Sequence, residues 1–410
     1  MPLQFDTLPL MILMVGVLIC LTILVKSALK AFSTPPLIGY IILGFAVRII
    51  DRPLGFLNTE ILNSFSFLST LGVITILFRV GLESNITGLI RQFPRASIIW
   101  VANVCLSATL GYLAARYFLN ISLIPSMFVA IALTATSMGI SVVVWQEAGA
   151  IHTPLGELLI DVAELDDISS VVLMALIFVL APVLKSSQAQ SLLPIILKSS
   201  GVFALKLFGF GAFCVFISRY LEKYMTSLFM KRKTVSDPML LVAGTGFIIA
   251  SLAELLGFSV AIGAMFAGLV FSRDPEAVKI DASFGTLYEL FSPFFFIEIG
   301  LLLDPVSIIS AVGIGLVLLI ARFIGKSLGA GIPTFFMTGW FGAGLIGFSM
   351  VPQAEVAMII MQHGKKLGSW ALPQDVFGGM VLVTAFTCVV SPLIIRRILT
   401  RWPLRSDEHG

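Results

Sequence analysis

Charged residues are scarce in this chain of 410 residues. Aspartate, glutamate, lysine and arginine together make up 12% of it, about half of their usual share in a soluble protein. So few charges cannot cover the surface of a soluble globular protein. The formal net charge of +3 is also too small to indicate a nucleic-acid partner. The composition therefore excludes a soluble domain and favours a membrane protein.

Cysteine and histidine are also rare, which limits the enzyme and metal chemistry open to the chain. The cysteines stand inside apolar runs, without metal-ligand spacing to one another or to a histidine; they are Cys20, Cys105, Cys214 and Cys388. The histidines stand at the edges of apolar segments or in the tail; they are His152, His363 and His409. We therefore expect buried packing thiols, no cofactor and no enzyme activity.

Apolar residues, by contrast, are abundant: they make up 58% of the chain, and the mean hydropathy is +1.03. About 20 helical residues cross a bilayer core about 30 Å thick. On that scale about 13 apolar segments are present. They run over roughly 8–28, 34–50, 62–82, 96–116, 123–145, 155–183, 194–218, 237–257, 259–272, 284–303, 308–332, 338–362 and 376–399. The alternating pattern of a membrane barrel is absent from the sequence, so we predict an all-α polytopic membrane protein.

Basic residues predict the orientation of these spans. An odd number of spans places the termini on opposite sides of the membrane. One set of connections carries most of the lysine and arginine, including the run at 231–233 and Arg396 and Arg397. Such connections face the cytoplasm. The start of the chain lacks the basic region of a signal peptide. We therefore expect the first span to be retained, the N-terminus outside and the C-terminus in the cytoplasm of a cell (inner) membrane.

The segment 155–183 carries five acidic residues within eleven positions: Glu157, Asp161, Glu164, Asp166 and Asp167. Acidic side chains at membrane depth are costly and mark function. Asp166 and Asp167 lie near mid-span, which predicts a cation site. The other three share one helix face and predict a cytoplasmic funnel of negative charge leading to that site. Helix-terminal acids and a structural ion pair are the alternative interpretation, mainly for Glu157.

Two further spans contain polar interruptions typical of broken membrane helices. Segment 123–145 contains Thr134, Thr136, Ser137 and Gly139, although its hydroxyls could instead bond within an intact helix. Segment 338–362 contains Pro352, Gln353 and Glu355, although a simple proline kink is the alternative there. The two segments are seven spans apart and thus antiparallel. Together they predict two inverted repeats whose broken helices cross at mid-membrane.

The segment 308–332 adds buried positive charge. Arg322 and Lys326 are four residues apart and share one helix face. A buried cation needs a carboxylate partner, and the acids of segment 155–183 are the candidates. For Lys326 the alternative is a side chain that extends to the cytoplasmic surface.

At these residues the chain resembles the monovalent cation:proton antiporters, specifically the second (bacterial Kef/Nap-like) branch of the sodium/hydrogen exchanger superfamily. The resemblance covers essentially all of residues 10–400. Eight motifs carry it in order, among them LFRVGLES at 77–84, TATSMGIS at 134–141, LDD at 165–167, GKSLG at 325–329 and MVPQAEV at 350–356.

The resemblance implies a homodimer in which each protomer has a scaffold and a moving core. The scaffold would comprise residues 8–82 and 237–303, the core 96–183 and 308–399, and residues 194–218 would form a linker helix. Asp167 would bind the cation, Na⁺, and we count Asp166, Thr136 and Ser137 with it among the expected ion-binding residues. Asp166 would pair with Lys326, and Glu355 would correspond to the glutamate that the family has in the second broken helix. Members of this kind exchange more protons than sodium ions, so we expect electrogenic Na⁺/H⁺ exchange.

Two departures from the family pattern leave other functions open. The family often has Arg-Gly-Glu where this chain has Gln353-Ala354-Glu355, and Glu298 is an additional membrane acid. Li⁺ or K⁺ could therefore be the cation, and an electroneutral K⁺/H⁺ antiporter is the alternative. From a different class, a cation channel or a germination-type receptor component is the rival, although the repeated filter sequence of a channel is missing.

Overall fold

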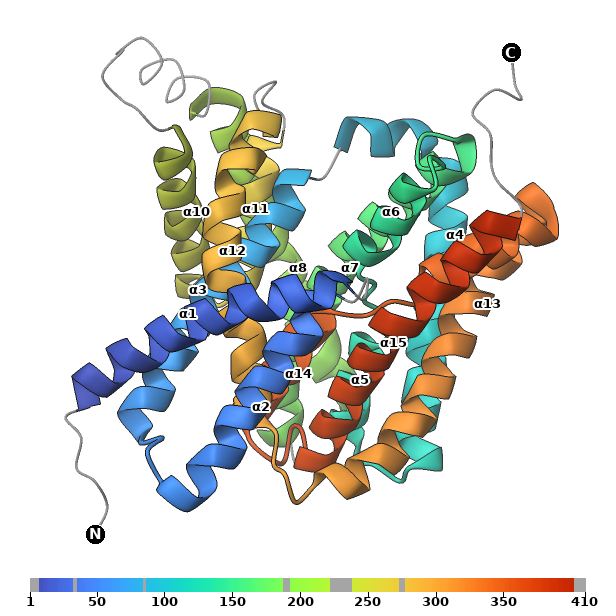
Figure 1. The fold of residues 1–410 in the computed structure, drawn as a ribbon. Coiled ribbons are helices and arrows are strands. Elements are labelled where there is room, and N and C mark those ends of the chain that lie inside the picture. The colour runs from blue at the N-terminus through green and yellow to red at the C-terminus, as the bar shows by residue number, and fades with distance from the viewer. Residues whose placement is uncertain are drawn as a thin grey trace. The chain divides into compact units, whose positions relative to one another are not determined.

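A computed structural model of the protein describes residues 7–31, 35–83, 86–186, 192–221, 238–272 and 277–401. Every element within these ranges is a helix (Figure 1). Eight helices there are long and apolar enough to cross a membrane, and shorter apolar helices accompany them. The predicted all-helical polytopic fold is confirmed, whereas the number of spans stays a prediction. The basic run at 231–233 lies outside the described residues.

The chain divides into two compact units, and each combines two separate stretches of sequence. Unit 1 comprises Met1–Asn85 and Ser187–Leu302, and unit 2 comprises Ile86–Ser186 and Leu303–Gly410. The described helices of unit 1 are α1 (Thr7–Ala31), α2 (Pro36–Leu54), α3 (Thr59–Glu83), α8 (Leu192–Phe216), η2 (Ile217–Leu221), α10 (Pro238–Leu255), α11 (Val260–Phe271) and α12 (Ala277–Leu302). Those of unit 2 are α4 (Ile86–Leu113), η1 (Ala114–Phe118), α5 (Leu123–Ala132), α6 (Met138–Glu147), α7 (Pro154–Ser186), α13 (Ile308–Ser349), α14 (Glu355–Leu367) and α15 (Gln374–Arg401).

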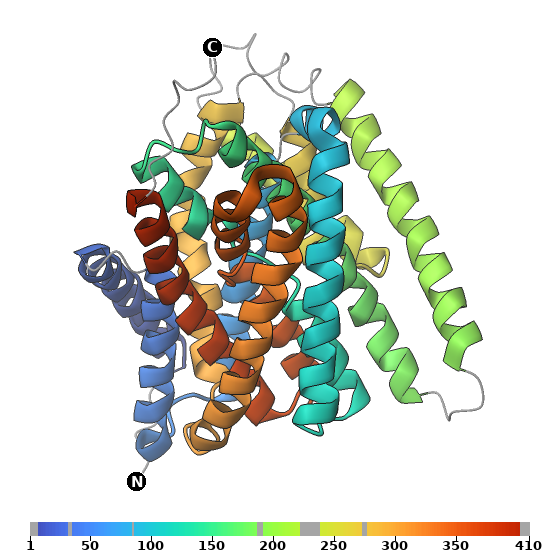
Figure 2. The ribbon, with the colours of Figure 1, turned by 90° about the vertical axis from the view of Figure 1, so that its right-hand side faces the viewer.

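Unit 1 is held together by close helix packing at glycines. Its α3 packs against α11 and α12, and α12 packs against α2. A Cβ atom on Gly81 of α3 would meet the carbonyl of Met265, and one on Gly268 of α11 would meet the carbonyl of Phe78. Small residues allow this approach of helix backbones in membranes. At the edge of the unit, α8 and η2 form one continuous rod (Figure 2).

Unit 2 is organised around α13, which packs against both α4 and α15 (Figure 2). The sequence predicts two spans here, 308–332 and 338–362, separated by a short connection. In the structure α13 consists of two helical parts that meet at a kink, where Gly339 is non-helical, with φ 76° and ψ −170°. Glycine adopts this positive φ readily because it has no Cβ atom. The chain doubles back here, because a Cβ atom on Gly331 would meet the carbonyl of Ala343 and one on Gly347 would meet the carbonyl of Ser327. The predicted connection is therefore present as a tight turn.

Two helices of unit 2 are discontinuous at the positions where their sequences are interrupted. The α5 helix ends at Ala132, and α6 begins at Met138 after an N-cap residue, Ser137, with an extended backbone. The α13 helix ends at Ser349, and α14 begins at Glu355. The intervening residues 133–137 and 350–354, here called the first and second break, connect the half-helices in Figure 1.

Candidate functional site

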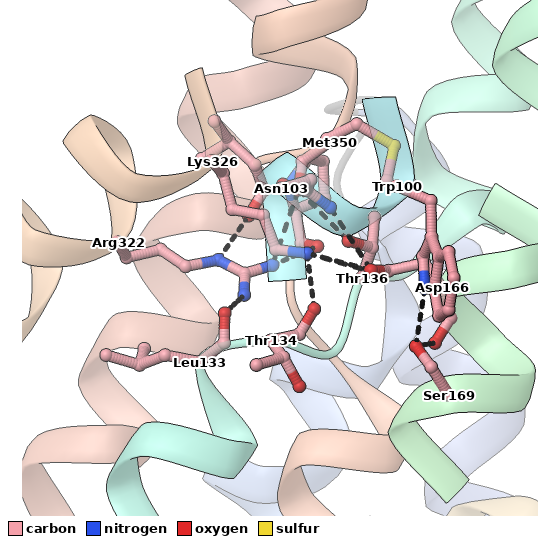
Figure 3. Close-up of polar contacts among 12 residues, drawn as sticks. Trp100, Asn103, Leu133, Thr134, Thr136, Asp166, Ser169, Arg322, Lys326 and Met350 are labelled. Carbon is pink, nitrogen blue, oxygen red and sulfur yellow. Dashed lines mark hydrogen bonds and ion pairs between the residues drawn. The ribbon is translucent and has the colours of Figure 1, made fainter. Parts of the chain in front are cut away.

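A buried ion pair lies at the centre of unit 2. Lys326 of α13 and Asp166 of α7 are both fully buried, and Lys326 Nζ lies 3.1 Å from Asp166 Oδ2 and 3.3 Å from Oδ1. Lys326 also donates to the carbonyl of Thr134 in the first break (Figure 3). The lysine therefore does not extend to the surface. The contact between Asp166 and Lys326 that the resemblance implies is present.

Asp166 has a second donor that the sequence analysis did not identify. Asn103, near the middle of α4, is fully buried, and its Nδ2 amide donates to Asp166 Oδ1 at 3.1 Å (Figure 3). A lone asparagine within the apolar run VANVCLS was the available signal. Asp166 therefore accepts hydrogen bonds from Asn103 and Lys326 together.

The buried cation one turn from Lys326 binds the backbone of both breaks. Arg322 donates to the carbonyl of Val351 at 2.9 Å and to that of Pro352 at 3.0 Å, with a longer contact to Met350 at 3.5 Å. It also donates to the carbonyl of Leu133 in the first break (Figure 3). The expectation that both cations of α13 would bond to carboxylates is thus wrong for Arg322. Carbonyls at the C-terminal ends of half-helices carry partial negative charge, and the guanidinium satisfies them.

The N-terminal ends of the other two half-helices meet a negative charge instead. Glu355 begins α14, and its Oε2 accepts from the hydroxyl of Ser137, the N-cap of α6, at 3.0 Å. The backbone amide of Ser137 also donates to the carbonyl of Pro352 at 2.9 Å. The two breaks are therefore hydrogen-bonded directly to each other. An acid at a helix N-terminus is stabilising because the helix dipole is positive there.

Further side chains join α6 to the end of α13. The hydroxyl of Ser141 donates to the carbonyl of Ser349 at 2.6 Å, and Trp145 Nε1 donates to the hydroxyl of the same serine at 2.9 Å. Thr136 Oγ1 donates to the carbonyl of Met350 at 3.2 Å. Because these groups are buried, each bond would cost about 1–3 kcal/mol to leave unmade.

Asp167 differs from its neighbour in exposure and surroundings. It is partly exposed, whereas Asp166 is fully buried. Asp166, Glu164 and Glu355 all lie near enough to Asp167 to repel its charge, and Lys326 lies near enough to attract it. Asp167 is therefore the accessible carboxylate of the predicted pair. A cluster of negative groups with one buried lysine can hold either a proton or a cation.

The hydroxyls of the first break can supply neutral oxygen ligands. Thr136 and Ser137 each donate their hydroxyl hydrogen to another group. The lone pairs of each hydroxyl oxygen are not used in that bond and can bind a cation. Hard monovalent cations are bound by such oxygens together with carboxylates. Within the described ranges, no group of three or more His, Cys, Asp or Glu side chains is arranged to hold a metal ion.

Gln353 of the second break is fully buried, and neither its Oε1 nor its Nε2 atom has a partner among the described residues. Its carbonyl accepts from the thiol of Cys388 on α15 at 3.1 Å. The preceding Pro352 lies in the break, where its missing amide hydrogen removes a helical bond. Pro352 and Gln353 therefore contribute their backbone carbonyls to the site: that of Pro352 accepts from Arg322 and Ser137, and that of Gln353 accepts from Cys388.

The three acids of the predicted funnel differ in exposure. Glu157, in the first turn of α7, is exposed, whereas Asp161 and Glu164 are each 8% exposed. Asp161 Oδ2 has no hydrogen-bond partner within the described part of the chain. The residues thus become more buried along α7 toward Asp166. The structure brings Asp166, Lys326 and both breaks together, with Glu157 at the far end of the same helix.

Crossed discontinuous helices with ionisable side chains at their crossing are the architecture of secondary transporters. The fold and the site of unit 2 therefore define the protein as a membrane transporter of that class.

The chain belongs to the sodium/hydrogen exchanger family, because residues 15–401 match the family described as "Sodium/hydrogen exchanger, transmembrane". It is 28% identical over 342 residues to the high-affinity Na⁺/H⁺ antiporter NhaS3 of Synechocystis sp., covering 81% of this chain and 71% of that protein. It is 27% identical to a Na⁺/H⁺ antiporter of Enterococcus hirae, covering 90% and 92%. It is also 27% identical to the Na⁺/H⁺-K⁺ antiporter GerN of Bacillus cereus, covering 88% and 89%.

Among solved structures, the chain resembles the sodium proton antiporter MjNhaP1 from Methanocaldococcus jannaschii at pH 8. The TM-score is 0.68 at 16% identity, and the match covers 96% of this chain and 97% of the other. At this identity the likeness concerns the fold.

Proposed function

We propose that the protein is a secondary antiporter that exchanges Na⁺ for H⁺ by alternating access. The observation that carries this proposal is the accessible Asp167 beside the buried Asp166–Lys326 pair, at the crossing of the two breaks. The relatives named as Na⁺/H⁺ antiporters support the choice of ions. We assign the chain to the Kef/Nap-like branch of the family on its aspartate pair.

The mechanism rests on competition at Asp167. A proton on this carboxyl group removes the negative charge that a cation needs, whereas a dehydrated cation held by the carboxylate and the hydroxyl oxygens of Thr136 and Ser137 excludes that proton. The site then carries either a cation or a proton, but not both. If unit 2 reorients only when loaded, transport of one ion in one direction requires transport of the other in the opposite direction.

Lys326 supplies the second proton of an electrogenic cycle. When Na⁺ binds at Asp167, the added positive charge disfavours the charged lysine. Lys326 then releases its proton and recovers it after the cation has left. Each cycle moves more proton charge than sodium charge, so the rate depends on membrane potential. An electroneutral K⁺/H⁺ cycle would require Lys326 to stay protonated throughout.

The decisive experiment uses the purified full chain in proteoliposomes under an imposed pH gradient, with Na⁺, Li⁺ and K⁺ tested separately. We expect Asp167→Asn to fold but to lose exchange, because asparagine cannot titrate or neutralise a cation. Glu147→Gln is the matched control, since Glu147 forms an exposed ion pair with Arg396 in the same unit. Sodium-dependent pH recovery at the wild-type rate in Asp167→Asn would refute the site. Rates that are independent of an imposed potential would support the electroneutral cycle.

We propose that Glu157, Asp161 and Glu164 form a cytoplasmic funnel for cations. Negative walls at a low-dielectric cleft raise the local cation concentration, and salt screens the effect. In inside-out vesicles, neutralising Glu157 and Asp161 together should weaken apparent Na⁺ affinity at low ionic strength and much less at high choline chloride. An unchanged affinity at low salt would assign these acids a structural role.

The remaining proposals concern assembly and orientation. We propose that unit 1 serves as the dimer scaffold and unit 2 as the moving core, with the linker helix in 194–218. The protein would be a homodimer in the cell (inner) membrane, with the N-terminus outside and the C-terminus cytoplasmic. Mass measurement of the protein in detergent tests the dimer, and labelling of single cysteines placed at each terminus in intact cells tests the orientation.

A further inference from the structure

The turn of α13 carries exposed aromatic side chains that the proposed exchange cycle does not use. Phe336 is 81% exposed and Trp340 is 82% exposed. The ring of Phe335 contacts both of them, with its centroid 5.4 Å from that of Phe336 and 4.5 Å from that of Trp340. Met337, between them in the sequence, is also exposed. These four residues, here called the tip, present an apolar surface at the place where the chain doubles back.

We propose that the tip is a lipid-binding surface, which inserts Phe336, Met337 and Trp340 at the boundary between the headgroups and the acyl chains of the bilayer, while Arg95 at the same level pairs with the phosphate of an anionic lipid. This inference goes beyond ion exchange, because it concerns how unit 2 is held in the membrane.

The tip continues a row of exposed aliphatic side chains along α13. The row has a spacing of four residues, and each member is between 44% and 58% exposed. Its members are Val312, Leu316, Ile320, Ile324, Leu328 and Ile332. From first to last the row extends about 30 Å, which is the thickness of the hydrocarbon core of a bilayer. Phe336 follows at the same spacing, about 6 Å further along. The row therefore faces acyl chains, and the tip lies where these chains end.

The packing of α13 against α4 places Arg95 level with the tip. A Cβ atom on Gly329 would lie 2.8 Å from the Cα of Asn103, and one on Gly325 would lie 3.1 Å from the Cα of Ser107. The two helices are therefore antiparallel. Continuing this register by two turns reaches the tip on α13 and Arg95, which is exposed, on α4. An arginine at this level can bind a phosphate group with two parallel hydrogen bonds.

An exposed aromatic pair at the other end of α4 supports the bilayer as the partner of the tip. Tyr117 and Phe118, in η1, are 69% and 79% exposed. They follow Arg95 by about 33 Å of helix. Aromatic side chains gather at both membrane–water interfaces, and this separation matches the hydrocarbon core between them. A protein partner at the tip would not require a second aromatic pair at this distance.

The tip is joined closely to the candidate site. A Cβ atom on Gly331 would lie 3.1 Å from the carbonyl oxygen of Ala343, and one on Gly347 would lie 2.6 Å from that of Ser327. The two arms of α13 are thus in backbone contact. One arm carries Lys326, and the other ends at the second break. The depth of the tip in the bilayer therefore sets the depth of both.

The test measures quenching of tryptophan fluorescence in the full chain, reconstituted into phospholipid vesicles. The chain has five tryptophans, so the emission lost in Trp340→Phe isolates the signal of Trp340. Lipids brominated near the headgroup end of the acyl chain should quench this signal roughly twofold more than lipids brominated near the chain end. Aqueous iodide should quench it little. Trp145→Phe is the matched control, because Trp145 is fully buried in the same unit and its signal should respond weakly to every quencher.

A second measurement tests the role of Arg95. In vesicles of neutral lipid with a small fraction of brominated phosphatidylglycerol, Arg95→Gln should lower the quenching of Trp340 by roughly twofold, because the anionic lipid is no longer attracted to the tip. Arg397→Gln is the matched control, since Arg397 is another exposed arginine of unit 2, and it should leave the quenching unchanged. Equal quenching in Arg95→Gln and wild type would overturn the part assigned to Arg95.

Two results would overturn the lipid-binding surface itself. Quenching of Trp340 by iodide without quenching by brominated lipid would place the tip in water. Protection from both quenchers would mean that a second copy of the chain or another protein covers it. If Trp340→Phe does not fold, the emission added by Phe336→Trp provides the same measurement and should show the same shallow depth. None of these readouts needs transport, so a failure here would leave the proposed exchange function untouched.

Discussion

Replacing Arg322 tests whether the guanidinium holds the two breaks together. The side chain is 1% exposed, and it donates to carbonyls on both breaks, with two good distances of 2.9 Å and 3.0 Å to Val351 and Pro352. Lysine would keep the charge, but its single nitrogen lacks the rigid fork that reaches several acceptors at once. We expect Arg322→Lys to lose at least two of the hydrogen bonds.

The magnitude follows from the kind of bond lost. A hydrogen bond from a charged donor contributes about 1.5–3 kcal/mol, so two lost bonds lower the stability by roughly 3–6 kcal/mol. The partial negative charge at the ends of α5 and α13 would also be less well compensated. The penalty for burying a charge is similar in wild type and Arg322→Lys, because both side chains are cationic. The difference in stability between the two therefore measures the lost hydrogen bonds.

The assay is the unfolding temperature of the purified protein in detergent, followed by size-exclusion fluorescence. Arg396→Lys is the matched control, since Arg396 forms an exposed ion pair with Glu147, and such pairs contribute about 0–1 kcal/mol. Arg322→Lys should melt well below both wild type and this control. Equal melting temperatures for the two variants would refute the proposal that Arg322 holds the two breaks together. Sodium exchange measured on the folded fraction should keep the wild-type pH profile, because Lys326 retains its contact with Asp166.

Two other changes test the ion pair and the packing around it. Lys326→Gln leaves Asp166 buried without its cation, so we expect a less stable core, residual exchange with a shifted pH optimum and a weaker dependence on membrane potential. Melting curves and exchange at imposed potentials measure this, and an unaltered potential dependence would contradict it. Gly329→Val should separate α13 from α4 and lower both stability and exchange, because its Cβ would meet Asn103 at 2.8 Å. Gly344→Ala on the same helix has open space around the new methyl group and should behave as wild type.

Much of the architecture could be predicted from local features of the sequence. Long apolar runs specify membrane helices because every backbone group in lipid must be bonded within its own segment. Hydroxyl residues and Pro352 interrupt two of those runs, and the structure has its two breaks at these places, whereas Gly139 lies within α6. The acids of α7 were visible because charge within an apolar run is conspicuous. These features depend on neighbours within a few turns, which a sequence displays directly.

One local expectation was modified by the surroundings. The partner of Arg322 is the backbone of two breaks, not a carboxylate. A broken membrane helix presents backbone carbonyls that have no partner within the helix. These carbonyls can pair with a buried cation in place of an acidic side chain.

The contacts of the candidate site were decided by tertiary structure alone. Asn103 and Asp166 are 63 residues apart, and Ser137 and Glu355 are 218 residues apart. No local pattern relates such positions, because their meeting depends on which helix faces pack and how closely glycines let the backbones approach. The sequence by itself determined the helices, their interruptions and the charged residues within the membrane. The fold of unit 2 decided which of those charges face one another, and it supplied an asparagine that no charge pattern singled out.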